Sequence, residues 1–430
     1  MVARQNKSLS ITAALFYLIA LALCLRIGIG AFVTNRYDTY WYRQWILDFP
    51  NGFFDIYSRA DAIALDYPPL FLVLVYPISL LYKIVPPNTY EMADMLFLKL
   101  VPILFDVATC LLLYHIGKRE STAEMGLAAA AFWAMNPSMF FNSAIWGQTD
   151  SVMCFILLAA FYLLYRDRRI ASTLVMAAAC MIKFQCLFFA PVWLLGIIDS
   201  CGIGTDRSVG DNLAGAKKLG ICAAVGAAAV AAVFLPFAMM SRDITLFPGI
   251  YFSSGGKYPY CTLNAFNFYG ALGLNWVDYN TPAFGSLSLA HLGYIITALG
   301  IGLLVVAWIF SKKRCIFVAG FFLMQHIFMF MPAMHERYQV AVLPFCIAVW
   351  LIRKDNRFAH ISVALTVFTL VNQLIVLANA TKGMLPWAQS YNQLMAMLSL
   401  VNLAIYIWSA VVCVAYLMQP TDTAQETKEV

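Results

Sequence analysis

Apolar runs long enough to cross a lipid bilayer recur along the chain from residue 10 to residue 418, and short polar or charged segments separate them. A transmembrane helix needs about 20 consecutive, mainly apolar residues. The pattern therefore predicts an all-α polytopic membrane protein without a separate soluble domain. We expect twelve spans, at residues 10–33, 95–116, 125–142, 150–165, 170–183, 184–199, 217–240, 289–310, 316–333, 338–352, 359–379 and 394–418.

Two of the apolar runs admit more than one topology. We interpret residues 70–86 as an interfacial or re-entrant element of a large first outer loop, 34–94. We interpret residues 170–198 as two short spans that turn at Lys183, which would otherwise lie in mid-membrane. Reversing both choices leaves the second half of the chain unchanged but places five more basic residues outside. The first topology is preferred because Lys and Arg are enriched in cytoplasmic loops.

The basic residues also predict which side each loop faces. With the N-terminus inside, the cytoplasmic segments contain most of the Lys and Arg: Arg4, Lys7, Lys118, Arg119, Arg166, Arg168, Arg169, Arg207, Lys217, Lys218, Lys312, Lys313, Arg314, Arg353, Lys354, Arg357 and Lys428. Both termini are then cytoplasmic, as the positive-inside rule expects. We expect a single membrane domain over residues 1–420 and a disordered cytoplasmic tail at 421–430.

Composition narrows the function class. Hydrophobic residues make up 62% of the chain, charged residues 12%, and the mean hydropathy is +0.76. The net charge of +6 follows the cytoplasmic loops, so it does not indicate nucleic-acid binding. The eleven cysteines lie mostly in apolar runs and suggest no disulfide framework. The chain contains no P-loop, no GxGxxG and no spacing typical of a metal site, so we expect neither a cofactor nor a metal.

The outer segments, in contrast, combine aromatic residues with acids, amides and bases. Aromatic residues alone are ordinary membrane anchors at an interface. That explanation does not account for polar and charged groups that recur beside them on one face only, which indicates a site there. The segments are "NRYDTYWYRQW" (35–45), "ALDYPPLF" (64–71), "NSAIWGQTDSV" (142–152), "TLNAFNFYG" (262–270) and "MHERY" (334–338).

Three outer acids are candidate functional groups, and each has an ordinary alternative. Asp38, just beyond the first span, could accept a proton from a hydroxyl nucleophile, or could be a solvated loop acid. Asp66 precedes two prolines, so it could bind substrate or simply stabilise a turn. Asp150 follows Trp146 and Gln148 and could bind substrate, or cap the span that it begins.

Two outer cations are candidate anion ligands. Arg337 offers a planar fork that can bind a phosphate through two hydrogen bonds, and Lys183 offers a compact charge. The alternative for both is an interaction with lipid headgroups. Within the spans, Lys99 and Asp106 could line an interior cavity, and Arg26 is expected to extend outward to the interface without a functional role.

These segments, in this order and together with "KFQ" (183–185), resemble the GT-C superfamily of membrane glycosyltransferases over residues 30 to 345. They are most similar to bacterial mannosyltransferase-like proteins related to the enzyme that adds the second mannose in GPI-anchor synthesis. The resemblance implies inverting transfer of a hexose, with mannose favoured, from a polyprenyl-phosphate-linked sugar donor. It also implies a lipid, polysaccharide or protein acceptor, contact with membrane lipid, and a place in the bacterial plasma membrane with an extracytoplasmic site.

The resemblance also implies residue roles. Asp38 matches the general base, and it has no neighbouring acid, which favours a metal-free reaction. Donor phosphate would be bound by Arg337, Lys183 and Tyr338. Substrate or acceptor would be bound by Asp66, Trp146, Gln148, Asp150, Asn264, Asn267, His335 and Glu336. The alternative function is a polytopic transporter or a lipid-linked-sugar flippase, although the two halves of the chain show no repeat.

Overall fold

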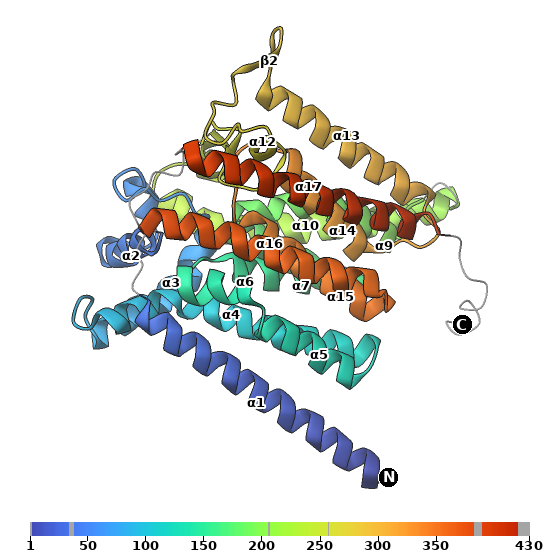
Figure 1. Cartoon of the computed structure of the whole chain (residues 1–430), viewed down its shortest axis with the longest axis horizontal. Helices are drawn as coiled ribbons and strands as arrows, with labels where there is room; N and C mark the ends of the chain where they lie inside the picture. The colour runs from blue at the N-terminus through green and yellow to red at the C-terminus, as the bar shows by residue number, and fades with distance from the viewer. Residues whose placement is uncertain (1, 34–37, 205–206, 257, 382–388, 420–430) are drawn as a thin grey trace.

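The computed structural model describes residues 2–33, 38–204, 207–256, 258–381 and 389–419, so the tail predicted at 421–430 lies outside the described residues. The chain forms a bundle of helices with two small sheets near one end (Figure 1). The N-terminal end of α1 (Val2–Phe32) and the C-terminal end of α17 (Gln389–Leu417) lie on the same side of the bundle, on the right in Figure 1. That both termini share one side of the membrane stays a prediction.

Six helices in the described part of the chain are long and apolar enough to cross a membrane. They are α1, α4 (Glu91–Glu120), α10 (Val209–Met240), α13 (Leu289–Phe310), α16 (Asn356–Thr381) and α17. Shorter apolar helices complete the bundle: α3 (Pro69–Ile84), α5 (Ala123–Ala134), α7 (Asp150–Tyr165), α8 (Arg169–Ile182), α9 (Ala190–Ser200), α14 (Ile316–Phe330) and α15 (Leu343–Arg353). The protein is therefore an all-α, multi-pass integral membrane protein, whereas twelve crossings and a single domain over 1–420 stay predictions.

Short elements connect these helices. The helical ones are α2 (Thr39–Asp48), η1 (Phe49–Asn51), η2 (Ile56–Arg59), α6 (Pro137–Phe140), the π-helical η3 (Phe141–Trp146), η4 (Phe184–Phe189), α11 (Leu246–Gly256), α12 (Phe268–Ala271) and η5 (Tyr338–Val342). The strands are β1 (Thr262–Leu263), β2 (Pro282–Phe284), β3 (Leu287–Ser288) and β4 (Met334–His335). Strand β1 pairs in parallel with β4, and β2 pairs antiparallel with β3. The first sheet joins two loops that are far apart in the sequence.

Some predicted spans match the helices closely and others do not. Helices α7 and α13 begin and end as predicted, at 150–165 and 289–310. The span predicted at 125–142 is instead broken: α5 ends at Ala134, and Asn136 caps a new helix by accepting bonds from the N–H groups of Ser138 and Met139. Proline at the first helical position favours such a restart because it lacks an N–H group. The run at 70–86 forms helix α3, and whether it crosses the membrane stays a prediction.

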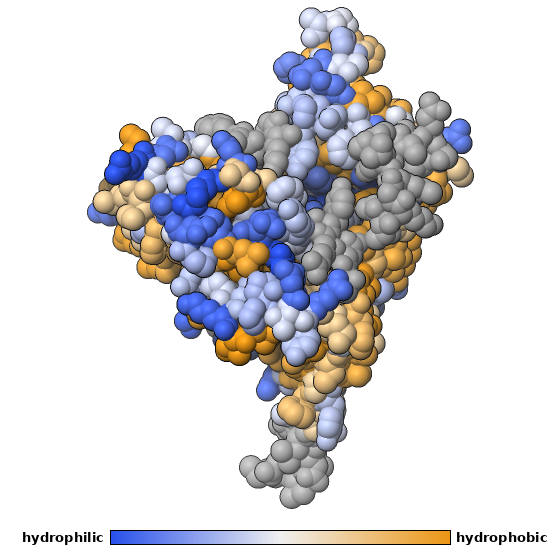
Figure 2. Space-filling model, turned by 90° about the vertical axis from the view of Figure 1, so that its left-hand side faces the viewer, coloured by the Kyte–Doolittle hydropathy of each residue, from blue (hydrophilic) through white to orange (hydrophobic). Residues whose placement is uncertain are grey.

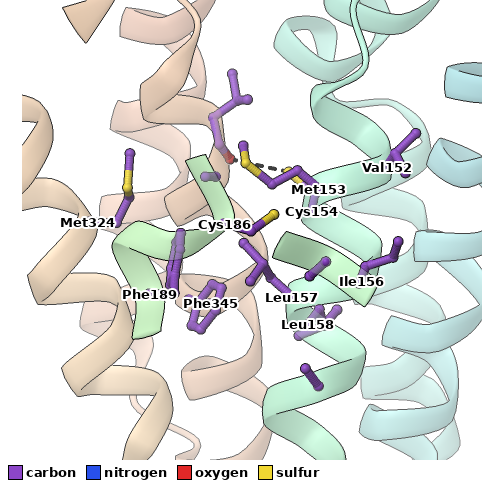
Figure 3. Close-up of a cluster of buried hydrophobic side chains, with 14 of the residues drawn as sticks. Val152, Met153, Cys154, Ile156, Leu157, Leu158, Cys186, Phe189, Met324 and Phe345 are labelled. Carbon is purple, nitrogen blue, oxygen red and sulfur yellow. Dashed lines mark hydrogen bonds between the residues drawn. The ribbon is translucent and has the colours of Figure 1, made fainter. Parts of the chain in front are cut away.

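The apolar core fixes the start of helix α7, where the outer polar segments meet the bundle. Side chains from α7 pack against α14, α15 and the η4–α9 segment (Figure 3). Phe189 and Phe345 stack with ring centroids 4.8 Å apart, and both are fully buried. The Cys154 thiol contacts the carbonyl oxygen of Val340 at 3.8 Å, which ties α7 to η5. This packing leaves Asp150, the first residue of α7, at the outer end of a rigid helix.

A buried ion pair corrects two expectations about the spans. Arg26 does not extend outward, because its Nε donates to Asp106 Oδ2 at 2.7 Å, and both side chains are fully buried. Asp106 also accepts bonds from Trp133 Nε1 at 2.7 Å and from Ser143 Oγ at 2.9 Å. Lys99 does not share a cavity with Asp106; its Nζ donates to carbonyl oxygens at the end of α1, including that of Val33 at 2.7 Å. Asp106 and Lys99, both on α4, therefore hold α1 against the bundle.

The outer polar segments gather at one end of the bundle. Figure 2 looks onto this end, which is the left-hand side of Figure 1, and shows many hydrophilic residues facing the viewer with hydrophobic residues toward the flanks. Helices α2 and α3 lie at this end (Figure 1). We call it the outer end, following the predicted sidedness of the loops.

Candidate functional site

A cavity of about 580 Å³ lies among the outer segments. It brings together most of the residues that the sequence singles out: Asp38, Asp66, Trp146, Lys183, Asn264, His335, Glu336, Arg337 and Tyr338 all line it. Gln148 and Asp150 stand behind this lining and bond to residues in it. Asn267 lies apart and caps α12 by accepting a bond from the N–H group of Gly270 at 3.1 Å. Segments that are three hundred residues apart in the sequence therefore form one site.

Asp38 occupies the N-cap position of α2, yet its side chain does not cap that helix. Its Oδ2 atom instead accepts bonds from Trp146 Nε1 at 2.7 Å and from Gln148 Nε2 at 2.5 Å. An N-cap aspartate ordinarily bonds to the N–H groups of its own first turn, which is worth about 1 kcal/mol. The carboxylate is half-buried and is not a freely solvated loop acid. Within the described chain its hydrogen-bond donors are neutral, and no cation pairs with it.

Gly147 allows the turn that carries both donors to approach α2. It has φ of +80°, a left-handed conformation that glycine adopts without strain. A Cβ atom there would lie 2.7 Å from the side chain of Thr39, the first residue of α2. The Gln148 amide is itself oriented, because its Oε1 atom accepts a bond from Tyr42 at 3.4 Å. The direction of the Asp38 carboxylate is therefore set by a local network.

Asp150 and Lys183 form a buried pair beside the cavity. Lys183 Nζ donates to Asp150 Oδ1, and Asn142 Nδ2 donates to Asp150 Oδ2 at 2.9 Å. Asp150 is not the cap of α7, because Thr149 precedes it in the N-cap position. Lys183 is 2% exposed and therefore does not reach lipid headgroups. The pair neutralises its own charge within the site.

His335, Glu336 and Arg337 form another part of the cavity wall. Arg337 Nη1 donates to Glu336 Oε1 at 2.6 Å, and His335 Nδ1 lies 3.8 Å from Glu336 Oε2. Burial raises the pKa of Glu336, but the attraction of Arg337 and His335 outweighs burial and brings that pKa to about 2. Burial lowers the pKa of His335 below its ordinary value of 6.5. At neutral pH this part of the wall therefore contains one carboxylate, one guanidinium and a neutral imidazole.

Arg337 keeps unused hydrogen-bonding capacity. Burial lowers its pKa, but Glu336 and Asp38 outweigh burial and raise that pKa well above its ordinary value, so the guanidinium is always charged. Its Nε atom is buried without a hydrogen-bond partner among the described residues, and lies 3.8 Å from Asp150 Oδ2. The guanidinium carbon lies 5.9 Å from the ring centroid of Trp146 and 5.5 Å from that of Tyr338. Cation–π contacts at such distances hold the group in place.

Strand β1 and the residues after it bring Asn264 to the same cavity. Leu263 pairs with His335 between β1 and β4, so this segment lies directly beside the His335–Arg337 segment. Asn264 has φ of +64°, and its Oδ1 atom accepts bonds from Trp276 Nε1 and Asn275 Nδ2, both at 3.0 Å. An indole N–H can only donate, so the orientation of the Asn264 amide is fixed.

Sequence reasoning missed several residues of this site. Trp41, Tyr258, Trp276 and Tyr294 also line the cavity, and they give it extensive aromatic walls. The only sequence signal for them is their position in or near outer segments, which anchoring aromatics share. Among the described residues, no group of three His, Cys, Asp or Glu side chains is arranged to hold a metal ion. Carboxylates, amides and aromatic faces together suit a ligand rich in hydroxyl groups.

Comparison with protein families gives one match. Residues 51–253, just under half of the chain, match the model of the family described as GPI transamidase subunit PIG-U. Asp66, Asp150 and Lys183 lie inside the matched segment, whereas Asp38 and Arg337 lie outside it. Comparison with curated proteins finds no match. The chain is thus similar to a GPI-related family over residues 51–253.

The match contradicts one expectation. The sequence predicts a polyprenyl-phosphate-sugar-dependent glycosyltransferase, and this prediction is wrong, because the matching family is described as a transamidase subunit. The polyprenyl-linked sugar donor and the mannosyltransferase assignment have no support from it. The resemblance to GT-C enzymes is retained only as a likeness to GPI-related proteins. The match also favours neither a transporter nor a flippase.

Proposed function

We propose that the protein binds the headgroup of a phosphate-bearing glycolipid in its outer cavity, without assigning it a reaction. The observation that carries the proposal is a set of unused hydrogen-bonding groups on one cavity. Asp38 offers acceptor sites, because its two donors both bond to Oδ2. Arg337 lines the cavity and bonds to Glu336 through Nη1 alone among the described residues, which leaves charged N–H donors. Ligand hydroxyls at Asp38 and a ligand phosphate at Arg337 would use both groups.

The aromatic walls support a sugar or inositol ring as part of the ligand. The face of such a ring carries C–H groups that pack well on indole and phenol rings, while its hydroxyl groups bond at the edges. Trp146 lines the cavity and already donates its N–H group to Asp38, so its ring is held next to the carboxylate. Trp276 is held in the same way by Asn264 on the other wall.

An adjoining apolar hollow supports a lipid and not a free glycan. This hollow, of about 300 Å³, shares Phe188, Tyr294 and Met331 with the cavity and continues among Pro191, Ile301 and other residues of η4, α9, α13 and α14. A hydrocarbon chain placed there would contact apolar side chains in place of bilayer lipid, so the hollow can accept it without burying a polar group of the ligand. The likeness to a GPI transamidase subunit supports a glycosylated phosphatidylinositol, which combines sugar hydroxyls, a phosphate and hydrocarbon chains.

Native mass spectrometry of the purified chain with three lipids tests the proposal. Mannosylated phosphatidylinositol has both glycan and phosphate, phosphatidylglycerol lacks the glycan, and a neutral diacyl glycolipid lacks the phosphate. We expect the mannosylated lipid to bind at least tenfold more tightly than either other lipid, since each lacks about 1.5 kcal/mol of charge-assisted hydrogen bonding. Equal binding of all three lipids would contradict the proposal.

We extend the proposal to topology: the cavity faces the extracytoplasmic side, both termini are cytoplasmic, and α3 does not cross. The distribution of basic residues supports this orientation. Single cysteines beside Asp38, Asp66 and Arg337, introduced into a variant whose native cysteines are replaced by alanine or serine, should all react with an impermeant maleimide from the same outer side. Reaction of any one of them only from the cytoplasmic side would overturn the topology. The likeness to a transamidase subunit further supports assembly with other chains, so a native complex should be larger than the 48.0 kDa of this chain.

A further inference from the structure

Two amide side chains from membrane-spanning helices hold the segment that carries Asn264. Asn372 of α16 accepts a bond from the N–H group of Phe266 at 3.0 Å and donates to the carbonyl oxygen of Asn264 at 2.7 Å. Asn402 of α17 donates to the carbonyl oxygen of Phe266 at 2.6 Å. Both amides are almost fully buried, with exposed fractions of 2% and 0%. The segment is therefore fastened from within the bundle.

These bonds answer a physical requirement. Residues 264–266 belong to neither a helix nor a strand, and apart from the isolated bridge between Asn264 and His335 their backbone groups need partners outside their own segment. An unpaired backbone group in apolar surroundings costs several kcal/mol. Asn372 satisfies one N–H and one C=O in the way that a neighbouring strand would. Its amide has a single possible orientation, because a backbone N–H only donates and a backbone C=O only accepts.

The same bonds determine what Asn264 presents to the cavity. Its Oδ1 atom is occupied by Trp276 and Asn275, which leaves the Nδ2 amino group as its available donor. The residue lines the cavity, is 4% exposed, and finds no acceptor for Nδ2 among the described residues. Asn372 bonds to the backbone of Asn264 and so controls where this donor lies.

We propose that Asn372 is a positioning residue for ligand binding: from α16 it sets the backbone of residues 264–266 and thereby directs the Asn264 amino group toward a hydroxyl or phosphate oxygen of the ligand. The inference rests on the proposed headgroup cavity. It deepens that proposal by making the cavity depend on a helix whose residue touches no ligand. The affinity of the cavity for its ligand would thus depend on one side chain of α16, Asn372.

A double-mutant cycle measures this coupling, with mannosylated phosphatidylinositol as the probe. Asn264→Gly removes the side-chain donor and suits the left-handed backbone at this position. Asn372→Leu has a similar side-chain volume and removes both hydrogen bonds of Asn372, to the N–H group of Phe266 and to the carbonyl oxygen of Asn264. Each should lower affinity about fivefold to tenfold, the value of about one hydrogen bond. The double variant should lose no more affinity than Asn264→Gly alone, because Asn372 acts through Asn264. If the affinity loss of the double variant equals the product of the two single losses, the positioning role is overturned and Asn372 has a general structural role.

Two further variants complete the design. Asn372→Asp is the conservative change: buried and neutral, its carboxyl group can still accept from Phe266 and donate to Asn264, so its affinity should stay close to that of the wild type. It also serves if Asn372→Leu does not fold, and a loss as large as that of Asn264→Gly would then overturn the role. Ser362→Ala on the same helix removes a buried hydroxyl that, among the described residues, bonds only to the carbonyl oxygen of Ala359, and should leave affinity unchanged.

Amide hydrogen exchange separates this inference from the proposed function, because it needs no ligand. Asn372→Leu should accelerate exchange at Phe266 and not at residues of α7. Unchanged exchange would overturn the positioning role even if the lipid binds. Failure of the wild-type protein to bind the lipid would overturn the proposed function, and with it the headgroup role given to Asn264.

Discussion

Two carboxylates in this protein have similar first partners and different surroundings. Asp106, between α1, α4 and α5, accepts from the indole N–H of Trp133 at 2.7 Å, and Asp38, in the outer cavity, accepts from that of Trp146 at 2.7 Å. Asp106 has in addition a guanidinium partner, Arg26, and is fully buried. Asp38 is half-buried and has no cation partner in the described chain.

The difference separates a structural carboxylate from the one that we propose to bind a ligand. Every oxygen of Asp106 is occupied from within the protein, which leaves nothing for a ligand. Asp38 is directed by two neutral donors on one oxygen, and its remaining capacity faces a cavity. Ionisable groups in a membrane protein are costly and often functional. The two roles are distinguished by how much of each carboxylate's hydrogen-bonding capacity is used within the protein, and not by burial or charge alone.

The largest predicted effect breaks the structural carboxylate. Asp106→Asn leaves the Arg26 charge buried without a counter-ion, and should lower the free energy of unfolding by about 3–5 kcal/mol. Thermal or denaturant unfolding in detergent measures the loss. The double variant Arg26→Met/Asp106→Leu removes both charges and should recover most of it. A double variant as unstable as the single one would contradict the ion-pair explanation.

The next effect concerns the binding carboxylate. Asp38→Asn removes a charged acceptor from the cavity, and should weaken binding of mannosylated phosphatidylinositol about 10-fold to 100-fold, as expected for about 1.5–3 kcal/mol. Its unfolding free energy should fall by less than that of Asp106→Asn, because Asp38 is half-buried and acts on the Arg337 charge without a contact ion pair. Titration of the lipid in nanodiscs, together with unfolding of the same preparation, measures both. A variant that loses stability and keeps affinity would reverse the roles that we assign to the two acids.

A smaller effect tests the turn that directs Asp38. Gly147→Ala should cost about 1–2 kcal/mol of stability for its left-handed backbone, and its Cβ would displace the turn from Thr39. Because Trp146 and Gln148 would move with the turn, lipid affinity should also fall several-fold. Gly202→Ala is the matched control: it has the same φ of +80° but no atom within 4 Å of its Cβ. The control should lose stability alone, and equal affinity losses in both variants would refute a local role of the turn.

The smallest effect is the pH dependence of lipid binding. The pKa of His335 is lowered by burial, so affinity should not change between pH 8 and 7, and should rise below about pH 6.5 as protonation adds a charge beside Arg337. The rise should be at most about tenfold, which corresponds to a pKa shift of one unit. A phosphodiester lipid keeps its own charge over this range. His335→Asn should abolish the rise, and a rise that persists in this variant would assign it to another group.

Unfolding stability should respond to pH in the opposite direction. Below pH 6.5 the unfolded chain protonates its histidine before the folded one does, so His335 lowers stability as the pH falls. Glu336, with a depressed pKa of about 2, contributes stability that is fully present above its ordinary pKa and is lost progressively as the pH falls from there through 2. Between pH 5 and 8 the change should therefore come from His335 alone among these two groups.

The sequence predicts the spans best where a single apolar run is uninterrupted. Helices α7 and α13 follow their predicted ranges, because nothing inside those runs competes with the helix. The break after α5 has a sequence signal, Asn136–Pro137, that the apolar pattern conceals. The partner of Arg26 lies 80 residues away, and the pattern of one span does not reveal which face of another it contacts.

The sequence predicts which residues form the site but not which of their side chains bond to one another. Asp38, Arg337 and the acids near them can be identified because they share the outer side. That Lys183 is occupied by Asp150 while Arg337 retains a free N–H depends on side-chain geometry that spacing does not specify. Asn372 was overlooked, although an amide within an apolar run is itself a sign of a buried polar contact.

The most direct test of the headgroup cavity is a cryo-electron microscopy structure of the protein in nanodiscs containing mannosylated phosphatidylinositol. We expect density for the phosphate at Arg337 and for ring hydroxyls within hydrogen-bond reach of Asp38 and Asn264. The hydrocarbon should continue into the apolar hollow that begins at Phe188 and Met331. Lipid density confined to the outer surface of the helices, with the cavity free of it at saturating lipid, would contradict the account.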